Sequence, residues 1–309
     1  LYRPIKEIKN NVYVNGSFAR VFNNEGKNIR TGFFAYDQKF RGQNKIIKSD
    51  INNDGQMETV VADNSSVSIY GELEKIKTIF PYGRQYNKGI SLALADLDGD
   101  QKMEIITGSE GGGANLIKIF NWYGDPTAGG EPASTSPKPR FAARRGGEPM
   151  AAGWNAYNKI WKNLGVHIAS GDVNGDGQKE IITGAGMGGG PHVKIFNKNG
   201  KLQSEFFAYS PKFRGGVNVA VGDVNGDGID EIITGAGIGG GPQVRIFDGK
   251  GKLLNEWFAY KTTKRDGVDV VASDIDGDGK DEILGLTTAV FTTSFKNDNN
   301  EINISSKIK

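Results

Sequence analysis

Short apolar segments recur along the chain, and each is bounded by glycine, asparagine or aspartate. In VNVAVGDVNGDGIDEIITGAG (217–237), one apolar segment precedes an acidic stretch and a second follows it. The segments are rich in β-branched residues and too short for helices of ordinary length. Runs of this kind between turn-forming residues are typical of strands joined by tight hairpins. The pattern therefore predicts an all-β protein.

The acidic stretch occurs five times, and its surroundings recur with it. After each copy come a second apolar segment, a glycine cluster in most copies, a third segment, a turn and a fourth segment. The copies are DINNDGQME from Asp50, DLDGDQKME from Asp96, DVNGDGQKE from Asp172, DVNGDGIDE from Asp223 and DIDGDGKDE from Asp274. The unit is thus four antiparallel strands in about 50 residues, which is the size of a β-propeller blade.

The two ends of the chain hold partial units. SFARVFNNEGKNIRTGFFAYDQKFRG (17–42) matches the second half of a unit, and VFTTSFKNDNNEINISSKIK (290–309) can supply a third and a fourth strand. We therefore expect six four-stranded blades, one without an acidic stretch and five with it, with seven as the alternative. We expect a single propeller domain over residues 1–309, with an insertion around 121–165 between the third and fourth blades. A sandwich or solenoid of the same repeat is the other architecture to consider.

The acidic stretches have the donor spacing of a calcium loop. Oxygen-bearing side chains stand at positions 1, 3, 5 and 9, position 7 can offer its backbone carbonyl, and position 6 is glycine in four copies. Ca²⁺ takes six to eight oxygen ligands, and the EF-hand loop uses the same alternation, whereas Mg²⁺ demands a stricter octahedron. The alternative is a polar turn, since Asp, Asn and Gly are common there.

The predicted ligands are the residues at positions 1, 3, 5, 7 and 9 of each copy. They are Asp50, Asn52, Asp54, Gln56, Glu58, Asp96, Asp98, Asp100, Lys102, Glu104, Asp172, Asn174, Asp176, Gln178, Glu180, Asp223, Asn225, Asp227, Ile229, Glu231, Asp274, Asp276, Asp278, Lys280 and Glu282. We expect up to five structural Ca²⁺ ions. The copy from Asp96 is expected to be the weakest site because Gln101 replaces the glycine at position 6.

These motifs resemble the FG-GAP and VCBS repeat families, whose relatives include the propeller of integrin α subunits. The segment VAVGDVNGDGIDEIITGAGIGGGPQVRIFD (219–248) is similar to the family's succession of strand, calcium loop, strand, glycine-rich loop and strand. The resemblance covers about residues 12–295. It implies a calcium-stabilised propeller in a surface or secreted protein that binds other molecules. Where the family often has aspartate at the last ligand position, all five copies here have glutamate, and the proline of the family's "GAP" motif is absent.

Composition limits the chemistry further. The chain has no cysteine, which excludes disulfides, cysteine zinc sites and thiol catalysis. Its 38 Lys and Arg nearly balance its 36 Asp and Glu, so the net charge of +2 indicates no partner. No apolar run is long enough to cross a membrane. Extracellular calcium modules bind at about 10⁻⁴–10⁻³ M, so the loops indicate a protein that is secreted or displayed on the cell surface.

A ligand site is expected on the face opposite the acidic loops, where the glycine clusters and basic blade-to-blade linkers lie. The candidate ligand-binding residues are Arg41, Arg144, Arg145, Trp154, Tyr157, Trp161, Arg214 and Arg265. Trp154, Tyr157 and Trp161 have the spacing of one side of a short helix, where they would either stack on a sugar or pack the helix onto the propeller. The KFRG segments likewise would either contact a ligand or wedge between blades.

Three functions are compatible with these features. The first is a binding or adhesion module that recognises a surface protein or a glycan, and an anionic glycan is one of the options. The second is a lyase or hydrolase acting on polysaccharide, although the two histidines, His167 and His192, stand in no catalytic motif and we predict no catalytic residue. The third is a purely architectural domain of a larger surface protein. We expect the chain either to be monomeric or to be part of such a larger protein. We expect no nucleic-acid partner and no membrane insertion.

Overall fold

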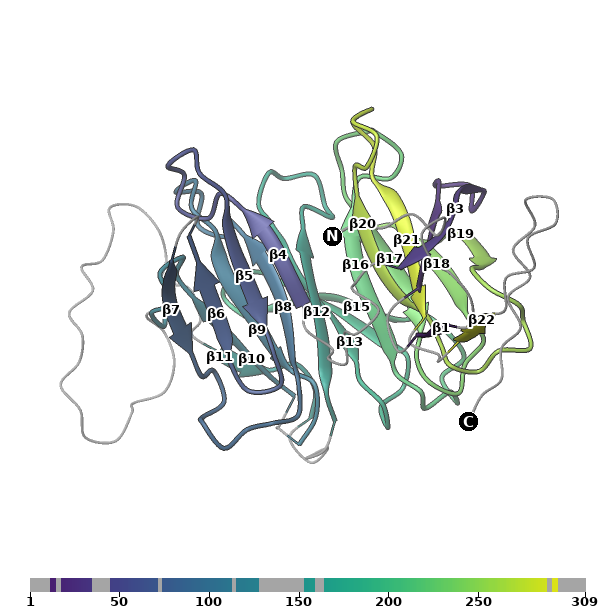
Figure 1. Ribbon diagram of the computed structural model, residues 1–309, viewed down its shortest axis with the longest axis horizontal. Coiled ribbons are helices and arrows are strands. Elements are labelled where there is room, and N and C mark those ends of the chain that lie inside the picture. The colour runs from purple at the N-terminus through teal and green to yellow at the C-terminus, as the bar shows by residue number, and fades with distance from the viewer. Residues whose placement is uncertain are drawn as a thin grey trace.

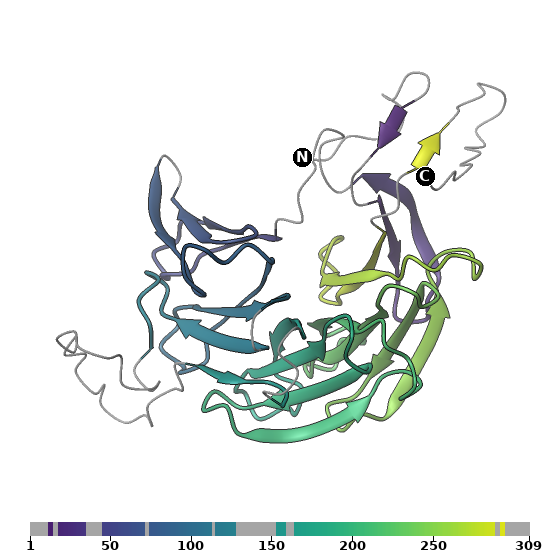
Figure 2. The same ribbon diagram turned by 90° about the horizontal axis from the view of Figure 1, so that it is seen from below.

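The computed structural model describes residues 12–14, 18–34, 45–71, 74–112, 115–127, 153–158, 164–287 and 291–293. All regular secondary structure within these ranges is β-strand. In the same ranges, no helix has the length and apolar character that a membrane crossing requires. The protein is an all-β propeller whose four-stranded antiparallel sheets stand side by side around a common centre (Figures 1 and 2).

The described strands form five four-stranded blades, which we number in chain order of their acidic stretches. Blade 1 contains β4(Lys45–Ser49), β5(Glu58–Ala62), β6(Val67–Tyr70) and β7(Lys75–Ile79). Blade 2 contains β8(Ile90–Ala95), β9(Glu104–Ser109), β10(Leu116–Phe120) and β11(Gly153–Asn155). Blade 3 contains β12(Val166–Gly171), β13(Glu180–Ala185), β14(His192–Phe196) and β15(Leu202–Phe207). Blade 4 contains β16(Val217–Gly222), β17(Glu231–Ala236), β18(Gln243–Phe247) and β19(Leu253–Phe258).

Blade 5 joins the two ends of the chain. Its inner strands are β20(Asp269–Ser273) and β21(Glu282–Thr287), and its outer strands are β2(Phe18–Phe22) and β3(Asn28–Phe34). β2 pairs with β21 in the register Phe22↔Ile283, so the partial N-terminal unit completes the last blade. In Figure 2 the purple N-terminal strands accordingly lie beside the yellow C-terminal ones.

The expectation of six blades, or seven, is therefore wrong: the residues that the structure describes form five. The N-terminal half-unit does not form a blade of its own, because it supplies the hydrogen-bonding partners that the edge of β21 would otherwise lack. The C-terminal stretch does not supply the third strand either. Its described part, β22(Phe291–Thr293), pairs instead with β1(Val12–Val14) in a separate two-stranded sheet.

The innermost strands pack against one another in chain order. β4 contacts β8, β8 contacts β12, β12 contacts β16 and β16 contacts β20. The second strands of blades 2, 3 and 4 lie between their neighbours and are buried along their whole length, as in EIITGA of β13 and β17. Because both faces of these strands are covered, they read as continuous apolar runs rather than alternating ones.

The glycine within EIITG allows this close packing. A Cβ atom added at Gly184 would lie 2.3 Å from the carbonyl oxygen of Val217, and one at Gly235 would lie 2.2 Å from that of Val268. Gly108 has the same relationship to Val166 at 2.9 Å. Each glycine therefore lets the first strand of the next blade approach its backbone.

Aromatic residues of the fourth strands join blade 2 to blade 3 and blade 4 to blade 5. Trp154 of β11 packs against Gly200 in the outer turn of blade 3, and Trp257 of β19 packs against Gly26 in the outer turn of blade 5. Trp154 also lies 5.6 Å from Phe196 between ring centroids. The predicted helix through Trp154 and Tyr157 is therefore wrong: Trp154 lies in a strand, where its ring is needed between blades.

The insertion follows the third strand of blade 2. β10 and β11 are neighbours in the sheet although residues 121–152 separate them in the chain. The fourth strand of blade 2 therefore lies within the 121–165 range predicted as insertion. The segments 128–152 and 159–163 lie outside the described residues.

Candidate functional site

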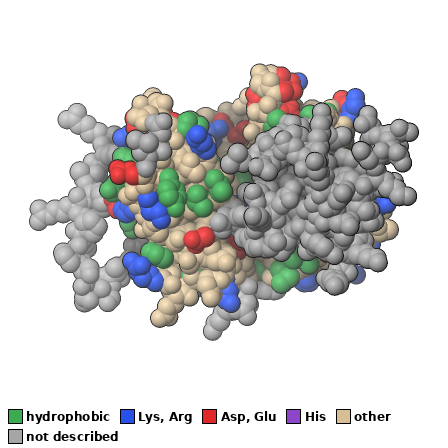
Figure 3. All heavy atoms as spheres, in the orientation of Figure 1, with side chains coloured by type: hydrophobic (Ala, Val, Ile, Leu, Met, Phe, Trp, Pro, Cys, Tyr) green, Lys and Arg blue, Asp and Glu red, His purple; other side chains and the backbone are tan. Residues whose placement is uncertain are grey.

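The acidic stretches form the loops between the first and second strands of the five blades. They all lie on one side of the propeller, and in Figure 1 the β20–β21 loop is the yellow projection at the top. Figure 3 shows acidic side chains gathered at the same place. We call these segments the acidic loops; they cover residues 50–57, 96–103, 172–179, 223–230 and 274–281.

Each acidic loop turns back on itself twice. The residues at positions 4 and 6 have positive φ in every copy, for example 77° at Gly175 and 82° at Gly177. This geometry lets Asp172 accept hydrogen bonds from the backbone N–H groups of Gly175 at 2.7 Å and Gly177 at 2.7 Å. The loop thus wraps around the side chain at position 1.

Gln101 adopts the same conformation as the glycines that it replaces. Its φ is 67°, and its backbone N–H donates to Asp96 Oδ2 at 2.8 Å, as Gly177 does to Asp172. The loop geometry from Asp96 is therefore retained, at the cost of a strained backbone. Its weakness as a metal site remains a prediction.

The glutamate at position 9 is buried in all five copies. Glu180 is 2% exposed and Glu231 is 5% exposed, and each accepts a hydrogen bond from the backbone N–H of position 2. Burial, together with the nearby aspartates, raises the pKa of Glu104 to about 8 and the pKa values of Glu180 and Glu231 to about 7. Several carboxylates are thus held close together with one of them out of water, an arrangement that a cation would stabilise.

Two further observations show that the loops fit a hard cation. Carboxylate oxygens of Asp96, Asp98 and Glu104 lie within 4.8 Å of one another, as do those of Asp274, Asp276 and Glu282. In the loop of blade 1, Oδ1 of Asn52 is buried and has no hydrogen-bond partner. An orphaned buried carbonyl oxygen at position 3 is the donor that an oxygen-coordinated ion needs.

The copies with asparagine at position 3 differ in one respect. Nδ2 of Asn174 donates to Glu180 Oε1 at 2.9 Å, and Asn225 makes the same hydrogen bond to Glu231. The amide therefore supports the buried carboxylate in these two loops. All predicted ligands of one copy lie in one hairpin, while coordination itself remains a prediction.

Adjacent acidic loops are joined by position 8, a role that the sequence did not reveal. The N–H of Asp230 donates to the carbonyl of Asp172 at 2.9 Å, and Asp172 N–H donates back to Asp230 Oδ2 at 2.7 Å. Asp281 donates to the carbonyl of Asp223 at 2.8 Å in the same way. The available signal was the acidic residue at position 8, which only the last two copies carry.

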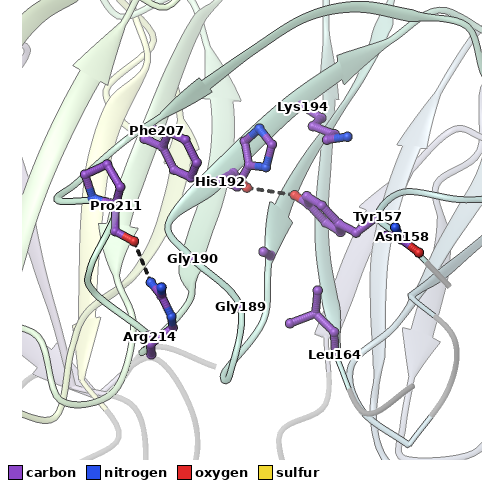
Figure 4. Close-up of a pocket in the computed structure, with 11 residues that line it drawn as sticks. Tyr157, Asn158, Leu164, Gly189, Gly190, His192, Lys194, Phe207, Pro211 and Arg214 are labelled. Atoms are coloured by element: carbon purple, nitrogen blue, oxygen red, sulfur yellow. Dashed lines mark hydrogen bonds between the residues drawn. The ribbon is translucent and has the colours of Figure 1, made fainter. Parts of the chain in front are cut away.

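A pocket of about 370 Å³ lies on the opposite side, between the blade 2–3 linker, blade 3 and the blade 3–4 linker (Figure 4). We call it the Phe207 pocket. Its side-chain lining combines apolar and cationic groups: Tyr157, Asn158, Leu164, Ala185, His192, Lys194, Phe207, Pro211 and Arg214. Gly189 and Gly190 of the glycine cluster form part of its wall.

Glu205 organises one side of the Phe207 pocket. Its Oε2 lies 3.2 Å from both Lys194 Nζ and His192 Nε2. The imidazole of His192 stacks on Phe207, with ring centroids 4.7 Å apart and planes 25° apart. Burial lowers the pKa of His192, so the ring is neutral at physiological pH.

The linker tyrosines have a structural role. Tyr157 is buried, and its hydroxyl donates to the carbonyl of His192 at 2.7 Å. Tyr82 and Tyr209 make the corresponding bonds to Leu116 and Gln243. The hydrogen bond of the Tyr157 hydroxyl therefore agrees with the packing role that was one of the two roles expected for this residue. The ring of Tyr157 also borders the Phe207 pocket.

The predicted arginines divide into two groups. Arg214 and Arg265 are exposed, and each donates to two carbonyl oxygens of its own linker, so neither bridges to a neighbouring blade there. Phe213 is partly buried against the core of blades 3 and 4, as the wedge alternative predicts. Arg41, Arg144, Arg145 and Trp161 lie outside the described residues.

Polar residues also gather at the start of the innermost strands. Burial lowers the pKa of His167, while the charges of Glu110, Lys45 and Asp269 also act on it. Ser91 Oγ accepts from the N–H of Ile168 at 2.9 Å, and Asn218 donates to the carbonyl of Val268. Both hydrogen bonds cross between adjacent blades.

Comparison with known protein families identifies the same repeats. A family model described as FG-GAP-like repeat matches residues 50–107, 172–234 and 223–285. Integrin alpha-8 of Gallus gallus is 29% identical over 108 residues, which are 31% of this chain and 9% of that protein. The chain thus spans about a tenth of the length of this relative.

Similar solved structures differ in what they do. A lectin of Agrocybe aegerita with specific recognition of non-reducing terminal N-acetylglucosamine has a TM-score of 0.43 at 13% identity, covering 96% of this chain and 79% of that one. The rhamnogalacturonan lyase YesW has a TM-score of 0.38 at 13% identity, covering 95% and 66%. The V. cholerae biofilm matrix protein Bap1 has a TM-score of 0.39 at 12% identity, covering 83% and 41%. Likenesses at this level assign neither a ligand nor an activity.

Proposed function

Because the chain belongs to the FG-GAP-like repeat family, whose model matches more than half of its residues, we propose that it is a calcium-stabilised binding module. It acts outside the cell, as a secreted or surface-displayed protein, and its role is adhesion. Its ligand is a glycan or a surface protein, held on the face opposite the acidic loops.

The observation that carries the calcium proposal is the buried glutamate of each acidic loop. Glu58, Glu104, Glu180, Glu231 and Glu282 are all less than 10% exposed, and each has aspartates of its own loop nearby. Ca²⁺ would neutralise these carboxylates and would take oxygens from positions 1, 3, 5, 7 and 9. Up to five ions would be bound, each stiffening a hairpin that is hydrogen-bonded to the neighbouring blade.

The binding proposal is supported by the Phe207 pocket and by the similarity to an integrin segment. The pocket is open to solvent on the side where the blade linkers lie, and it combines an exposed aromatic ring with cationic groups. Pockets of a few hundred Å³ with apolar walls and a few polar groups are the usual sites for small ligands or ligand segments.

A polysaccharide-acting enzyme is the second candidate, and one observation favours it. His192 is paired with Glu205 at 3.2 Å and borders the Phe207 pocket together with Lys194 and Arg214. A neutral imidazole can accept a proton, and nearby cations can stabilise a developing anion. A lyase would require this arrangement to act on a bound uronate.

A binding screen with an activity control tests these proposals. The protein would be presented in millimolar Ca²⁺ to a glycan array, acidic polysaccharides and extracellular protein extracts, and bound polysaccharides would be monitored for chain cleavage. We expect binding without cleavage. Cleavage would establish the enzyme instead, and an absence of any bound glycan or protein would contradict the binding function.

A further inference from the structure

We propose that the Phe207 pocket and the corresponding surface of blade 4 bind successive carboxylated sugar residues of one acidic polysaccharide chain. This inference rests on the proposed binding function and narrows its ligand class. It depends on three features: an exposed aromatic ring, a cation that forms no ion pair with a carboxylate of the described residues, and the repetition of both in the next blade.

The first feature is the ring of Phe207. Its side chain is 50% exposed at the end of β15, although ring burial is strongly favourable, and His192 covers one side of it. Pro211 and Leu164 add apolar surface within the same pocket. The C–H face of a pyranose ring would pack on such a surface, while its hydroxyl groups would remain in contact with water.

The second feature is the charge distribution. Glu205 pairs with Lys194 and His192, so that side of the Phe207 pocket is close to neutral. Arg214 is exposed, and no carboxylate of the described residues forms an ion pair with it. A guanidinium held by its own linker carbonyls at one nitrogen keeps other N–H groups for a ligand, and a carboxylate fits that geometry.

The third feature is the repetition in blade 4. Phe258 is 47% exposed at the end of β19, and Arg245 pairs with Glu256 at 2.7 Å as Lys194 does with Glu205. Arg265 donates to its own linker carbonyls as Arg214 does. The corresponding residues are Phe207 and Phe258, Lys194 and Arg245, Glu205 and Glu256, His192 and Gln243, and Arg214 and Arg265.

Blade 2 lacks this combination, which argues against a purely structural origin. At the position of Phe207 it has Asn155, whereas the buried linker tyrosine, which the fold needs, is retained as Tyr157. Two like surfaces on neighbouring blades match a polymer whose charged unit repeats. A folded protein partner would have no reason to present the same group twice.

The test is a binding measurement with acidic polysaccharides and their short oligosaccharides. Hyaluronan, alginate, pectin and heparin would be titrated in millimolar Ca²⁺ at low and at high salt, and the best binder would be used with its carboxyl-reduced form. The variants are Phe207→Ala, Arg214→Gln and Phe258→Ala. Leu202→Ala, an exposed position at the other end of β15, is the matched control.

We expect salt-sensitive binding that falls at least about tenfold in Phe207→Ala, in Arg214→Gln and on carboxyl reduction, and by less in Phe258→Ala. Leu202→Ala should bind as the wild type does, and all variants should keep a calcium-raised melting temperature. Unchanged affinity in Phe207→Ala, or in Phe258→Ala with the long polymer, would overturn the inference. So would a wild-type protein that binds neutral glycans or proteins but no acidic polysaccharide, a result that leaves the proposed binding function intact.

Discussion

The side-chain amide of Asn53 donates a hydrogen bond to Oε1 of Gln101 at 3.0 Å, and so links the acidic loops of blades 1 and 2. These two residues are also the non-glycine residues at the left-handed positions of the acidic loops, with φ of 59° and 67°. This conformation costs roughly 1–2 kcal/mol for a residue such as Gln101, whereas asparagine adopts it more readily. The hydrogen bond thus joins the two loops through the side chains at their left-handed positions.

This relationship predicts different stabilities for two substitutions at one position. Both Gln101→Gly and Gln101→Ala lose the hydrogen bond to Asn53, but only the glycine variant also relieves the backbone strain. We expect the glycine variant to be more stable than the alanine variant by about 1 kcal/mol. Chemical denaturation of both variants in Ca²⁺ measures the difference, and equal stabilities would show that the position carries no strain.

The linker tyrosines predict a second effect. Tyr209→Phe removes a hydroxyl that donates to the carbonyl of Gln243 at 2.8 Å and leaves buried acceptors unsatisfied. We expect a loss of about 1–3 kcal/mol in the free energy of unfolding. Tyr123→Phe, at an exposed ring, is the control and should stay within about 0.5 kcal/mol of the wild type. If Tyr209→Phe loses no more stability than the control, the hydroxyl does not stabilise the contact between the blades.

The EIITG glycines predict a third effect. A Cβ at Gly235 would lie 2.2 Å from the carbonyl oxygen of Val268, so Gly235→Ala must push β20 away from blade 4. Overpacking of this kind costs about 1–3 kcal/mol. Gly111→Ala is the matched control because its Cβ would meet only ordinary contacts. Thermal unfolding would show the difference, and equal melting temperatures would contradict the close approach of the two blades.

Much of this fold can be predicted from the repeat, because each unit carries its own strands and turns. The position of the acidic loops follows from the same pattern. The number of blades cannot be predicted from it, since the half-unit around Phe22 looks the same whether it starts a blade or completes one with Ile283. Trp154 shows a second limit: the spacing to Tyr157 fits a helix, but its strand pairing depends on Ile117, a residue distant in sequence.

The candidate sites also differ in how much of each can be predicted from the sequence. The ligands of one acidic loop lie within nine residues, so their spacing is visible in the sequence. The Phe207 pocket draws on two linkers and blade 3, and only folding brings Leu164, His192 and Arg214 together. The contact of Asp230 with Asp172 likewise depends on how neighbouring blades pack.

The raised glutamate pKa values predict how the calcium-free protein responds to pH. Burial holds the pKa of Glu231 and Glu180 at about 7 and that of Glu104 at about 8 in the folded chain, above the unfolded values. Folded-state pKa values that are raised stabilise the protein at low pH, and this stability is lost as the pH rises through them. In chelator, the free energy of unfolding should therefore fall between about pH 4.5 and pH 8, by at most about 1.4 kcal/mol for each unit by which a glutamate pKa is raised.

Two comparisons check this pH dependence. Glu231→Gln should flatten part of the slope in chelator, because the amide cannot titrate. In millimolar Ca²⁺ the decline should disappear, since the ion binds the deprotonated loops more tightly as the pH rises. The decline is measured most cleanly above about pH 6.5, because below that pH the lowered pKa values of His167 and His192 act in the opposite direction and destabilise the fold as the pH falls. A stability that rises with pH in chelator would contradict the buried, uncompensated glutamates.

The most direct test of the central claim is a calcium titration measured by calorimetry, together with thermal unfolding of the same samples. The account predicts more than one and up to five bound Ca²⁺ ions per chain, with a melting temperature that rises with free calcium and falls again in chelator. Glu231→Gln and Asp223→Asn should each remove one ion and part of the rise. A chain that binds no calcium, and whose melting temperature is the same in chelator, would contradict the claim that these loops are metal sites.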